Sequence, residues 1–347
     1  MAQAQSLQAN TSLLFTAMAN FHTKDISGKN FLVTGGAGFI GSHIVEYLVK
    51  NGAGKVRVLD NLATGLQSNI DLFSGYANYE FVLGDIRDYD TCVEAVKGID
   101  HVSHQAALGS VPRSVKDPVT SNAVNISGFL NMITAAKDGG VKTFVYASSS
   151  AIYGDEPNLP KREEKVGNPL SPYAVTKKTN ELYAEVFAKL YGLKVVGLRY
   201  FNVFGPRQDP NGPYAAVIPL FVSGIMQQTP VYINGDGEQT RDFTFVDNAV
   251  QANIRGMLTD NEAAFGQAYN VAVGENFSVN FLYQSIREQL GIAHNATYRE
   301  ERAGDIRNSL ADISKAQTLL EYQPTKRFID GLAQTVEFFK AKERQVV

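Results

Sequence analysis

From Asn30 onward, short runs of β-branched and aromatic residues alternate with longer amphipathic stretches. The short runs have the length of strands buried on both faces, and the longer stretches have the periodicity of helices. Strands that alternate with helices predict right-handed βαβ units, and therefore an α/β fold with a doubly wound parallel sheet. The expected strands are Phe31–Thr34, Val56–Leu59, Tyr79–Leu83, His101–His104, Thr143–Ala147 and Lys194–Arg199, and the expected helices are Gly41–Lys50, Tyr89–Val96, Ser121–Lys137 and Pro172–Leu190.

The regular alternation ends at Arg199. Residues 202–238 are rich in loop-forming residues, periodic segments return over 239–273, and a last helix is expected near Phe328–Lys342. A smaller second domain that closes over the carboxyl edge of the sheet would explain this pattern. The predicted division is an N-terminal arm over 1–25, a first domain over 26–201 to which 239–273 return, and a C-terminal α/β substrate-binding domain over 202–238 and 274–347.

Composition excludes several classes of protein. The net charge is −3, whereas a nucleic-acid-binding surface requires an excess of basic residues. Cys92 is the only cysteine, so the chain forms no internal disulfide and no thiolate metal cluster, and no metal site is expected. No apolar run reaches the roughly 20 residues that span a bilayer, and the first 25 residues lack the basic start of a secretory signal. We therefore expect a cytoplasmic protein without a membrane partner.

A glycine-rich turn joins the first expected strand to the first expected helix. Gly35, Gly38 and Gly41 let the backbone turn tightly, and the helix start offers unpaired N–H groups to a diphosphate. This context favours a Rossmann-type dinucleotide-binding unit. Asp60 ends the next strand, where a carboxylate accepts hydrogen bonds from the ribose hydroxyls of NAD and repels the 2′-phosphate of NADP, although a turn aspartate is the ordinary alternative. Asp85 follows the third strand and is expected near the adenine.

A Tyr-x-x-x-Lys element opens the helical stretch that begins at residue 172. Tyr173 and Lys177 are four residues apart and share a helix face. The lysine charge, together with a positive nicotinamide ring, is expected to lower the pKa of Tyr173 and make it a base near neutral pH. The serines of Ser148–Ser150 follow a buried strand and offer hydroxyl groups to a substrate oxygen. Taken singly, the Tyr-x-x-x-Lys element is also typical of a buried tyrosine beside a solvated lysine. The serine cluster is also typical of a serine-rich turn.

In combination, Thr34–Gly41, Ser148–Gly154 and Tyr173–Lys177 resemble the extended short-chain dehydrogenase/reductase family. The resemblance extends from about residue 29 to the C-terminus and is greatest to the sugar-nucleotide 4-epimerases, in particular the bacterial UDP-N-acetylglucosamine 4-epimerases. The segments that carry this closer likeness are His104–Arg113, Leu198–Gly205, Arg207–Gly212, Tyr232–Gly237 and Gly304–Asp312.

The resemblance implies an NAD-dependent isomerase of nucleotide-sugar metabolism and polysaccharide biosynthesis. Tyr173 would remove the proton from the sugar 4-hydroxyl, Lys177 would hold the nicotinamide ribose, and Ser149, assisted by Ser150, would bind the 4-oxygen. A hydride would pass from C4 to tightly bound NAD and return to the other face of the 4-keto sugar. The implied cofactor-binding residues are Gly35, Gly38, Phe39, Ile40, Gly41, Asp60, Asn61, Thr64, Gly65, Asp85, Ile86, Gln105, Ala106, Ala107, Asn125, Tyr173, Lys177 and Tyr200.

The same resemblance assigns the UDP-sugar side. Arg241 and Arg302 match diphosphate-binding positions, for which the arginine fork is well suited, although each alone is more typical of a surface charge. Asp305 matches a position at the uridine ribose. Ser309 stands where glucose-restricted relatives have a bulky tyrosine, so we expect UDP-N-acetylglucosamine and UDP-N-acetylgalactosamine as the substrate pair. The other implied substrate-binding residues are Gly109, Ser110, Ser149, Ser150, Asn202, Gln208, Ala216, Val217, Tyr232 and Asn234.

Several alternatives remain open. A roomy pocket around Ser309 would also accept UDP-glucose and UDP-galactose, and a UDP-uronic acid 4-epimerase is a further alternative. Related dehydratases carry an Asp-Glu pair where this chain has Ser150 and Ala151, and related decarboxylases use a glutamate there. A non-catalytic NAD-sensing scaffold would typically lack the tyrosine or the lysine. Helices Ser121–Lys137 and Pro172–Leu190 resemble those that form the four-helix bundle of a homodimer; Val175, Leu182, Tyr183, Val186 and Leu190 are its candidate contacts or, in a monomer, core residues.

Overall fold

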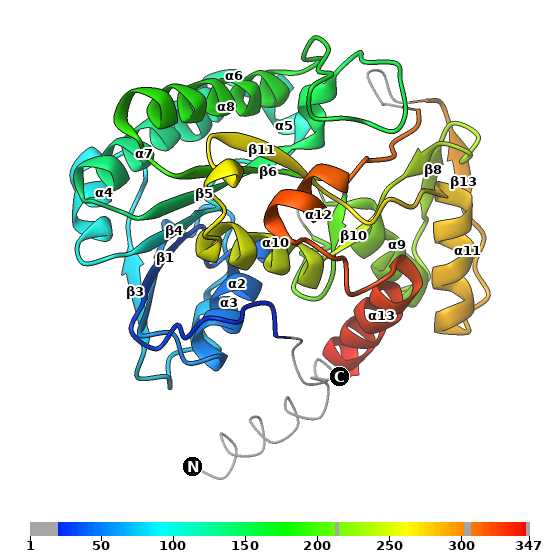
Figure 1. Cartoon of the computed structure of the whole chain (residues 1–347). Helices are drawn as coiled ribbons and strands as arrows, with labels where there is room; N and C mark the ends of the chain where they lie inside the picture. Colours follow the sequence, from blue (N-terminus) through cyan, green and yellow to red (C-terminus); the bar gives the residue numbers. More distant parts are fainter. Residues whose placement is uncertain (1–19, 212–214, 302–306, 345–347) are drawn as a thin grey trace.

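The computed structural model describes residues 20–211, 215–301 and 307–344. At its centre is a parallel sheet in the order β11-β6-β5-β4-β1-β2-β3 (Figure 1), which confirms the α/β doubly wound arrangement. The strand order reverses beside β1, and ligands of such sheets bind at the carboxyl edge next to that reversal. The seven strands are β1 (Asn30–Thr34), β2 (Lys55–Asp60), β3 (Tyr79–Leu83), β4 (His101–His104), β5 (Thr143–Ser149), β6 (Val195–Tyr200) and β11 (Gln267–Val271).

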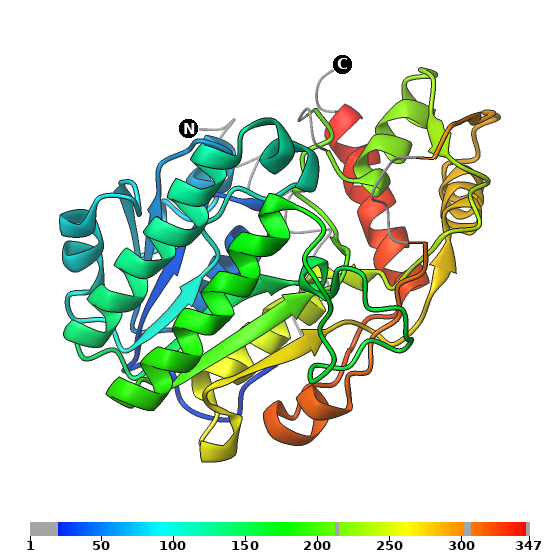
Figure 2. The same cartoon turned by 90° about the horizontal axis from the view of Figure 1, so that it is seen from above.

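Successive side chains of a strand point to opposite faces of the sheet, and in these strands both sets are apolar. Both faces of the sheet are therefore covered by helices. Phe31 and Val33 of β1 belong to a core shared with α2 (Phe39–Lys50) and α10 (Val246–Leu258), whereas Leu32 points into the opposite core. That second core is covered by α4 (Tyr89–Val96), α7 (Phe129–Asp138) and α8 (Pro172–Tyr191), the last two lying side by side in Figure 2.

Three elements differ from the prediction. The single helix expected over 121–137 consists of α6 (Pro118–Asn122), a π-helical turn (Ala123–Gly128) and α7. Strand β5 continues two residues beyond Ala147, which places Ser148 and Ser149 in register with Arg199 and Tyr200 of β6. Strand β11 was not predicted as a strand, because Gln267 and Asn270 interrupt its apolar pattern.

The C-terminal part gathers at one end of the sheet (Figure 1). Here Phe204, Phe245 and Phe328 are buried in a third core. The predicted division into domains stays a prediction. The elements of this part are α9 (Val217–Met226), α11 (Val279–Leu290), α12 (Ser314–Leu320), α13 (Phe328–Arg344) and the pairs β7 (Val203–Phe204) with β10 (Thr244–Phe245), β9 (Thr240–Arg241) with β12 (Phe277–Ser278), and β8 (Tyr232–Asn234) with β13 (Thr297–Arg299); α3 (Gln67–Asp71) and α5 (Val111–Lys116) complete the larger part.

The described end of the expected N-terminal arm packs on α2. Phe21 is buried and stacks on Tyr47, whose hydroxyl oxygen accepts a hydrogen bond of 2.8 Å from the Phe21 backbone N–H. The first 19 residues of the arm lie outside the described residues. Among the helices that the structure describes, none combines the length and the apolar character that a membrane crossing requires.

Candidate active site

The glycine turn between β1 and α2 leaves no room for side chains. Gly35 has a φ of 69°, and a Cβ atom there would lie 2.7 Å from the Ala106 backbone nitrogen. A Cβ at Gly41 would lie 2.2 Å from the Gly35 oxygen. The turn therefore packs against both the start of α2 and the segment after β4. Such a cradle of backbone at a helix start fits a dinucleotide diphosphate.

Asp60 stands at the carboxyl end of β2, beside this turn. Its carboxylate accepts hydrogen bonds from the backbone N–H groups of Ala37, at 3.0 Å, and Leu62, at 2.8 Å. Burial raises its pKa despite these bonds. Gly65 packs against it, since a Cβ there would lie 3.1 Å from Asp60 Oδ1. A carboxylate held at this place suits the ribose of NAD and disfavours the 2′-phosphate of NADP.

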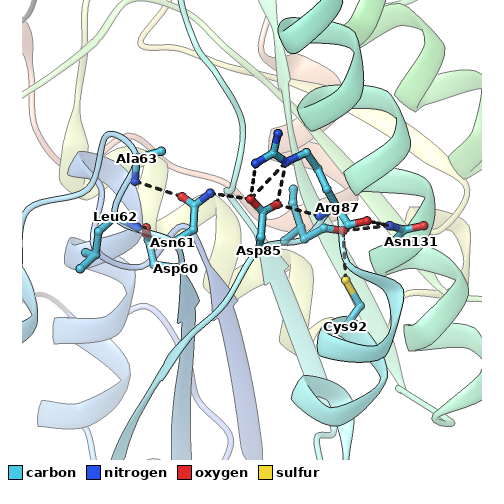
Figure 3. A network of polar contacts seen from close by, with 9 residues as sticks. Asp60, Asn61, Leu62, Ala63, Asp85, Arg87, Cys92 and Asn131 are labelled. Atoms are coloured by element: carbon cyan, nitrogen blue, oxygen red, sulfur yellow. Dashed lines mark hydrogen bonds and ion pairs between the residues drawn. The ribbon is translucent and has the colours of Figure 1, made fainter.

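A polar network joins the ends of β2 and β3 (Figure 3). Asn61 Nδ2 donates to Asp85 Oδ2 at 2.9 Å, and Arg87 Nη2 forms an ion pair of 2.6 Å with the same oxygen. The hydrogen bonds from Arg87 lower the pKa of Asp85 to about 2. An adenine amino group at Asp85 would share the carboxylate with both partners. Arg87 is not among the predicted site residues, because an arginine two residues after an aspartate has the pattern of an ordinary turn.

Next to this network, Cys92 is buried in α4. Its thiol donates to the Ile86 oxygen over 3.3 Å, and burial raises its pKa to about 12. Ile86 is itself buried in the second core, together with Cys92. A thiol in this state is inert, and Cys92 has a packing role.

The predicted residues after β4 and β6 are connected through Asn253. Tyr200 donates its hydroxyl to Gln105 Oε1 at 3.0 Å, and Asn253 Nδ2 donates to the Tyr200 oxygen at 2.7 Å. Asn125 lies on the π-helical turn, a form that is frequent at functional sites. It hydrogen-bonds both backbone groups of Leu108 and the Thr176 hydroxyl, so it braces a loop against α8.

Tyr173, Ser149 and Lys177 come together where the start of α8 meets the end of β5. The Ser114 hydroxyl oxygen accepts the Tyr173 backbone N–H at 2.9 Å, and Ser171 caps the helix through the Ala174 N–H. Lys177 Nζ donates to the Ala147 oxygen at 2.8 Å and lies 5.9 Å from the centre of the Tyr173 ring. Burial lowers the pKa of Lys177 to about 8.

The expected lowering of the Tyr173 pKa is wrong for the protein alone. Burial raises this pKa, and a hydrogen bond with Ser149 opposes the rise only in part. The second charge on which the expectation depended, the positive nicotinamide ring, comes with the cofactor. The Ser149 hydroxyl oxygen also accepts the Ala151 N–H at 3.2 Å, so the turn that contains Ser150 is anchored on Ser149.

A buried ion pair behind these residues escaped the sequence analysis. Arg199 forks onto Glu181, with Nε–Oε1 and Nη2–Oε2 distances of 3.0 and 2.8 Å. Ser148 donates to Glu181 Oε1 at 2.5 Å, and Arg199 also donates to the Tyr153 hydroxyl at 3.0 Å. The network fixes the end of β5 against α8. Glu181 stands four residues after Lys177 on the same helix face, but this spacing gives no sign that Glu181 is buried against Arg199.

Arg241, a predicted diphosphate-binding residue, lies close to Ser309, the residue on which the expected sugar preference depends. Arg241 Nη1 donates to the oxygens of Thr240, at 2.8 Å, and Arg307, at 3.2 Å. The Ser309 N–H donates to the same Thr240 oxygen at 3.1 Å, and Ser309 is buried. One short segment thus carries both Arg241 and the contact to Ser309. Arg302 and Asp305 lie outside the described residues.

The remaining predicted substrate residues occupy loops and element ends. Asn202 has a φ of 36° and donates to the Asp242 oxygen at 3.0 Å, and the Ser110 hydroxyl caps α5 directly after Gly109. Two of them are engaged by Arg299, whose guanidinium lies 4.9 Å from the Tyr232 ring centre and donates to Asn234 Oδ1 at 2.6 Å. Of the other predicted substrate residues, Ala216 precedes α9, which begins at Val217. Of the predicted cofactor residues, Phe39 and Ile40 open α2, Thr64 lies in the loop after β2, and Ala107 lies in the loop after β4.

Known proteins resemble the chain over nearly its whole length. A family model described as "NAD dependent epimerase/dehydratase family" matches residues 31–272. A putative UDP-glucose 4-epimerase of Methanocaldococcus jannaschii is 38% identical over 315 residues, which cover 90% of this chain and 99% of that protein. Among solved structures, the UDP-N-acetylglucosamine 4-epimerase of Methanobrevibacter ruminantium in complex with UDP-N-acetylmuramic acid has 42% identity, a TM-score of 0.86 and coverage of 91% and 99%. The UDP-glucose 4-epimerase of Thermus thermophilus in complex with NAD has 36% identity and a TM-score of 0.80, and the match covers 90% of this chain and 99% of that protein.

Proposed function

Because the chain belongs to the NAD-dependent epimerase/dehydratase family, we propose that it is a UDP-sugar 4-epimerase whose preferred pair is UDP-N-acetylglucosamine and UDP-N-acetylgalactosamine. The observation that carries the proposal is the meeting of Tyr173, Ser149 and Lys177 at the end of β5. The glycine turn and Asp60 are the residues that would hold NAD. When bound, NAD would supply the acceptor and then the donor of the hydride at the sugar C4, so that a 4-keto sugar is formed and reduced again with no net redox change.

The residues of the chain carry the proton chemistry. Tyr173 accepts the proton of the sugar 4-hydroxyl and later returns it. Ser149, which already hydrogen-bonds Tyr173, orients the 4-oxygen toward it. Lys177 places a positive charge beside the phenol, which favours the phenolate. Because Lys177 is buried and Tyr173 is half-buried, water has limited access to the proton that they move.

The sugar nucleotide would be oriented by its diphosphate. The proposed ligands are Arg241, which the structure describes, and Arg302, with Asp305 at the uridine ribose. A guanidinium binds phosphate oxygens in a bidentate manner, which fixes direction as well as position. A fixed diphosphate would let the sugar turn and present either face of C4 to the nicotinamide, as inversion at C4 requires.

The preference for N-acetylated sugars rests on Ser309. Its side chain is small and buried, and it adjoins the Arg241 segment through the bond to Thr240. A tyrosine there would occupy the space that we assign to the acetamido group. UDP-glucose, UDP-galactose and UDP-uronic acids are the competing substrates, and the relatives of this chain carry several of these names.

The purified protein is tested with five UDP-sugars, namely the two N-acetyl sugars, UDP-glucose, UDP-galactose and UDP-glucuronic acid, without added NAD. We expect NMR to show interconversion of the N-acetyl pair. No turnover of either N-acetyl sugar, with turnover of another, would reassign the substrate. No turnover of any of the five would remove the proposed activity.

Ser309→Tyr tests the pocket directly. We expect the variant to lose about tenfold or more in kcat/KM for N-acetyl sugars and less for UDP-glucose, because an added aromatic ring collides only with the acetamido group. The ratio of the two kcat/KM values is the measurement. An equal loss for both sugars would contradict the assignment of this pocket.

A further inference from the structure

A buried arginine joins the loop after β7 to the helix that follows the glycine turn. Arg207 adopts a left-handed backbone conformation with a φ of 66°, and its side chain is 8% exposed. A residue with a Cβ atom is strained in this conformation and stays there only when its surroundings hold it. The contacts that hold it come from α2.

Two side chains of α2 contact the Arg207 guanidinium. Its Nη2 donates to Glu46 Oε2 at 2.5 Å and lies 2.6 Å from His43 Nδ1. His43 Nε2 is 2.9 Å from the Pro206 backbone oxygen, so two successive loop residues are attached to α2. Burial, followed by the charge of Arg207, lowers the pKa of His43 to about 3. His43 is therefore neutral, and Glu46 supplies the opposite charge.

Such a pair is a poor device for stability alone. Taking both charges out of water is costly, and an apolar pair of similar volume is often as stable or more so. The best-attested use of buried charge pairs is to select one relative placement of two elements. Here those elements are α2, which begins at the glycine turn, and the loop that carries Gln208.

Gln208 presents an acceptor that the protein leaves unused. Its Nε2 donates to the Val203 oxygen at 3.2 Å. Its Oε1 is buried and has no hydrogen-bond partner among the residues that the structure describes. A buried acceptor without a partner is costly, so this oxygen is suited to a hydroxyl or amide N–H of a ligand.

We propose that Arg207 is a positioning residue that sets the place of the Gln208 oxygen relative to the glycine turn. Sugar and cofactor are then held at one fixed distance, because the contacts of Arg207 join the loop that carries Gln208 to helix α2. The inference rests on the proposed function, since it takes Gln208 to face the sugar. Arg207 itself touches neither ligand and acts through Gln208.

The test replaces Arg207 and Glu46 together, because a substitution of either one alone would leave a buried charge without its partner. Lys50, which also pairs with Glu46 at 2.6 Å, has a side chain that is 36% exposed and stays solvated. We expect the double variant Arg207→Met with Glu46→Met to raise the KM for UDP-N-acetylglucosamine about tenfold. The affinity for UDP, measured by calorimetry, and the NAD content of the purified protein should match those of the wild type, because UDP lacks the sugar and the glycine turn is intact. A KM within twofold of the wild-type value, with UDP binding intact, would overturn the proposal, even if the melting temperature fell.

A matched control removes an ion pair remote from the loop. Arg57 of β2 pairs with Glu80 of β3 at 3.0 Å, and its side chain is 12% exposed. Arg57→Met with Glu80→Met should leave both KM and UDP affinity unchanged. If the first double variant does not fold, Arg207→Lys keeps the charge but not the fork and should raise KM in the same way. Absence of activity in the wild-type protein would instead refute the proposed function.

Discussion

Lys177 is buried and Tyr173 is half-buried, and this environment shifts their pKa values in opposite directions. Burial favours the neutral form of each group, and so raises the tyrosine pKa and lowers that of the lysine. The chemistry of the site therefore depends on a proton balance that single substitutions can shift.

Tyr173→Phe removes the phenolic oxygen and leaves the ring. We expect kcat to fall by about 10²–10⁴-fold, which is the usual contribution of a positioned acid–base group. NAD content and melting temperature should stay close to the wild-type values, because the aromatic packing is retained. Turnover by NMR is the measurement, and a loss smaller than about tenfold would contradict the assigned role.

The pH profile reports on Lys177. Its pKa is lowered to about 8, so the ammonium is present below that pH and is lost above it. We expect kcat/KM to decline above about pH 8, provided that activity returns when the sample is brought back to neutral pH. A profile that continues to rise to about pH 10 would show that the charge of Lys177 is not required.

The turn between β1 and α2 shows how an element is shaped by the absence of side chains. Gly35 and Gly41 are required by contacts with backbone atoms, which do not move aside as flexible side chains do. The turn is thus a rigid feature on which the cofactor site is built.

Gly41→Ala should abolish NAD retention, since its Cβ would lie 2.2 Å from the Gly35 oxygen. The protein is gel-filtered to remove free NAD and then denatured by heat, and the NAD that is released is assayed enzymatically. Gly28→Ala is the control, because a Cβ at Gly28 meets nothing within 4 Å. Full NAD content in the Gly41 variant would disprove the predicted cradle.

The sequence predicts the elements whose pattern is local. Gly35, Asp60 and Ser149 each follow an apolar run, so their place at the carboxyl edge of the sheet could be expected. The Glu181–Arg199 pair could not, because two charged residues normally indicate a solvated surface and only the tertiary packing buries them. Strand β11 escaped for the same reason: its Asn270 is satisfied by distant backbone groups.

At the scale of the whole molecule, helix α8 carries an apolar stripe that is exposed in the single chain, among the residues that the structure describes. On α8, Leu182 and Val186 are 57% and 46% exposed, and Val175 and Leu190 continue the same stripe. Tyr183, by contrast, is partly buried against the second core. Exposed apolar patches of this kind often mark interaction sites. A homodimer built on α8 and α7 therefore stays our prediction.

Leu182→Glu should convert a dimer into a monomer, because a charge at the centre of an apolar helix pair is left without hydration. Sedimentation velocity measures the change in mass. Ile329→Glu is the control, since Ile329 is 43% exposed on α13, away from this stripe. A wild-type protein that sediments as a monomer would refute the predicted dimer directly.

The burial of the only cysteine in the chain also has a practical consequence. Maleimide dyes react with thiolates, and a thiol with a pKa of about 12 offers almost none at neutral pH. A cysteine introduced on the loop that carries Gln208 would then take up a single fluorophore without removal of Cys92. Such a label would allow ligand-dependent movement of that loop to be followed in real time.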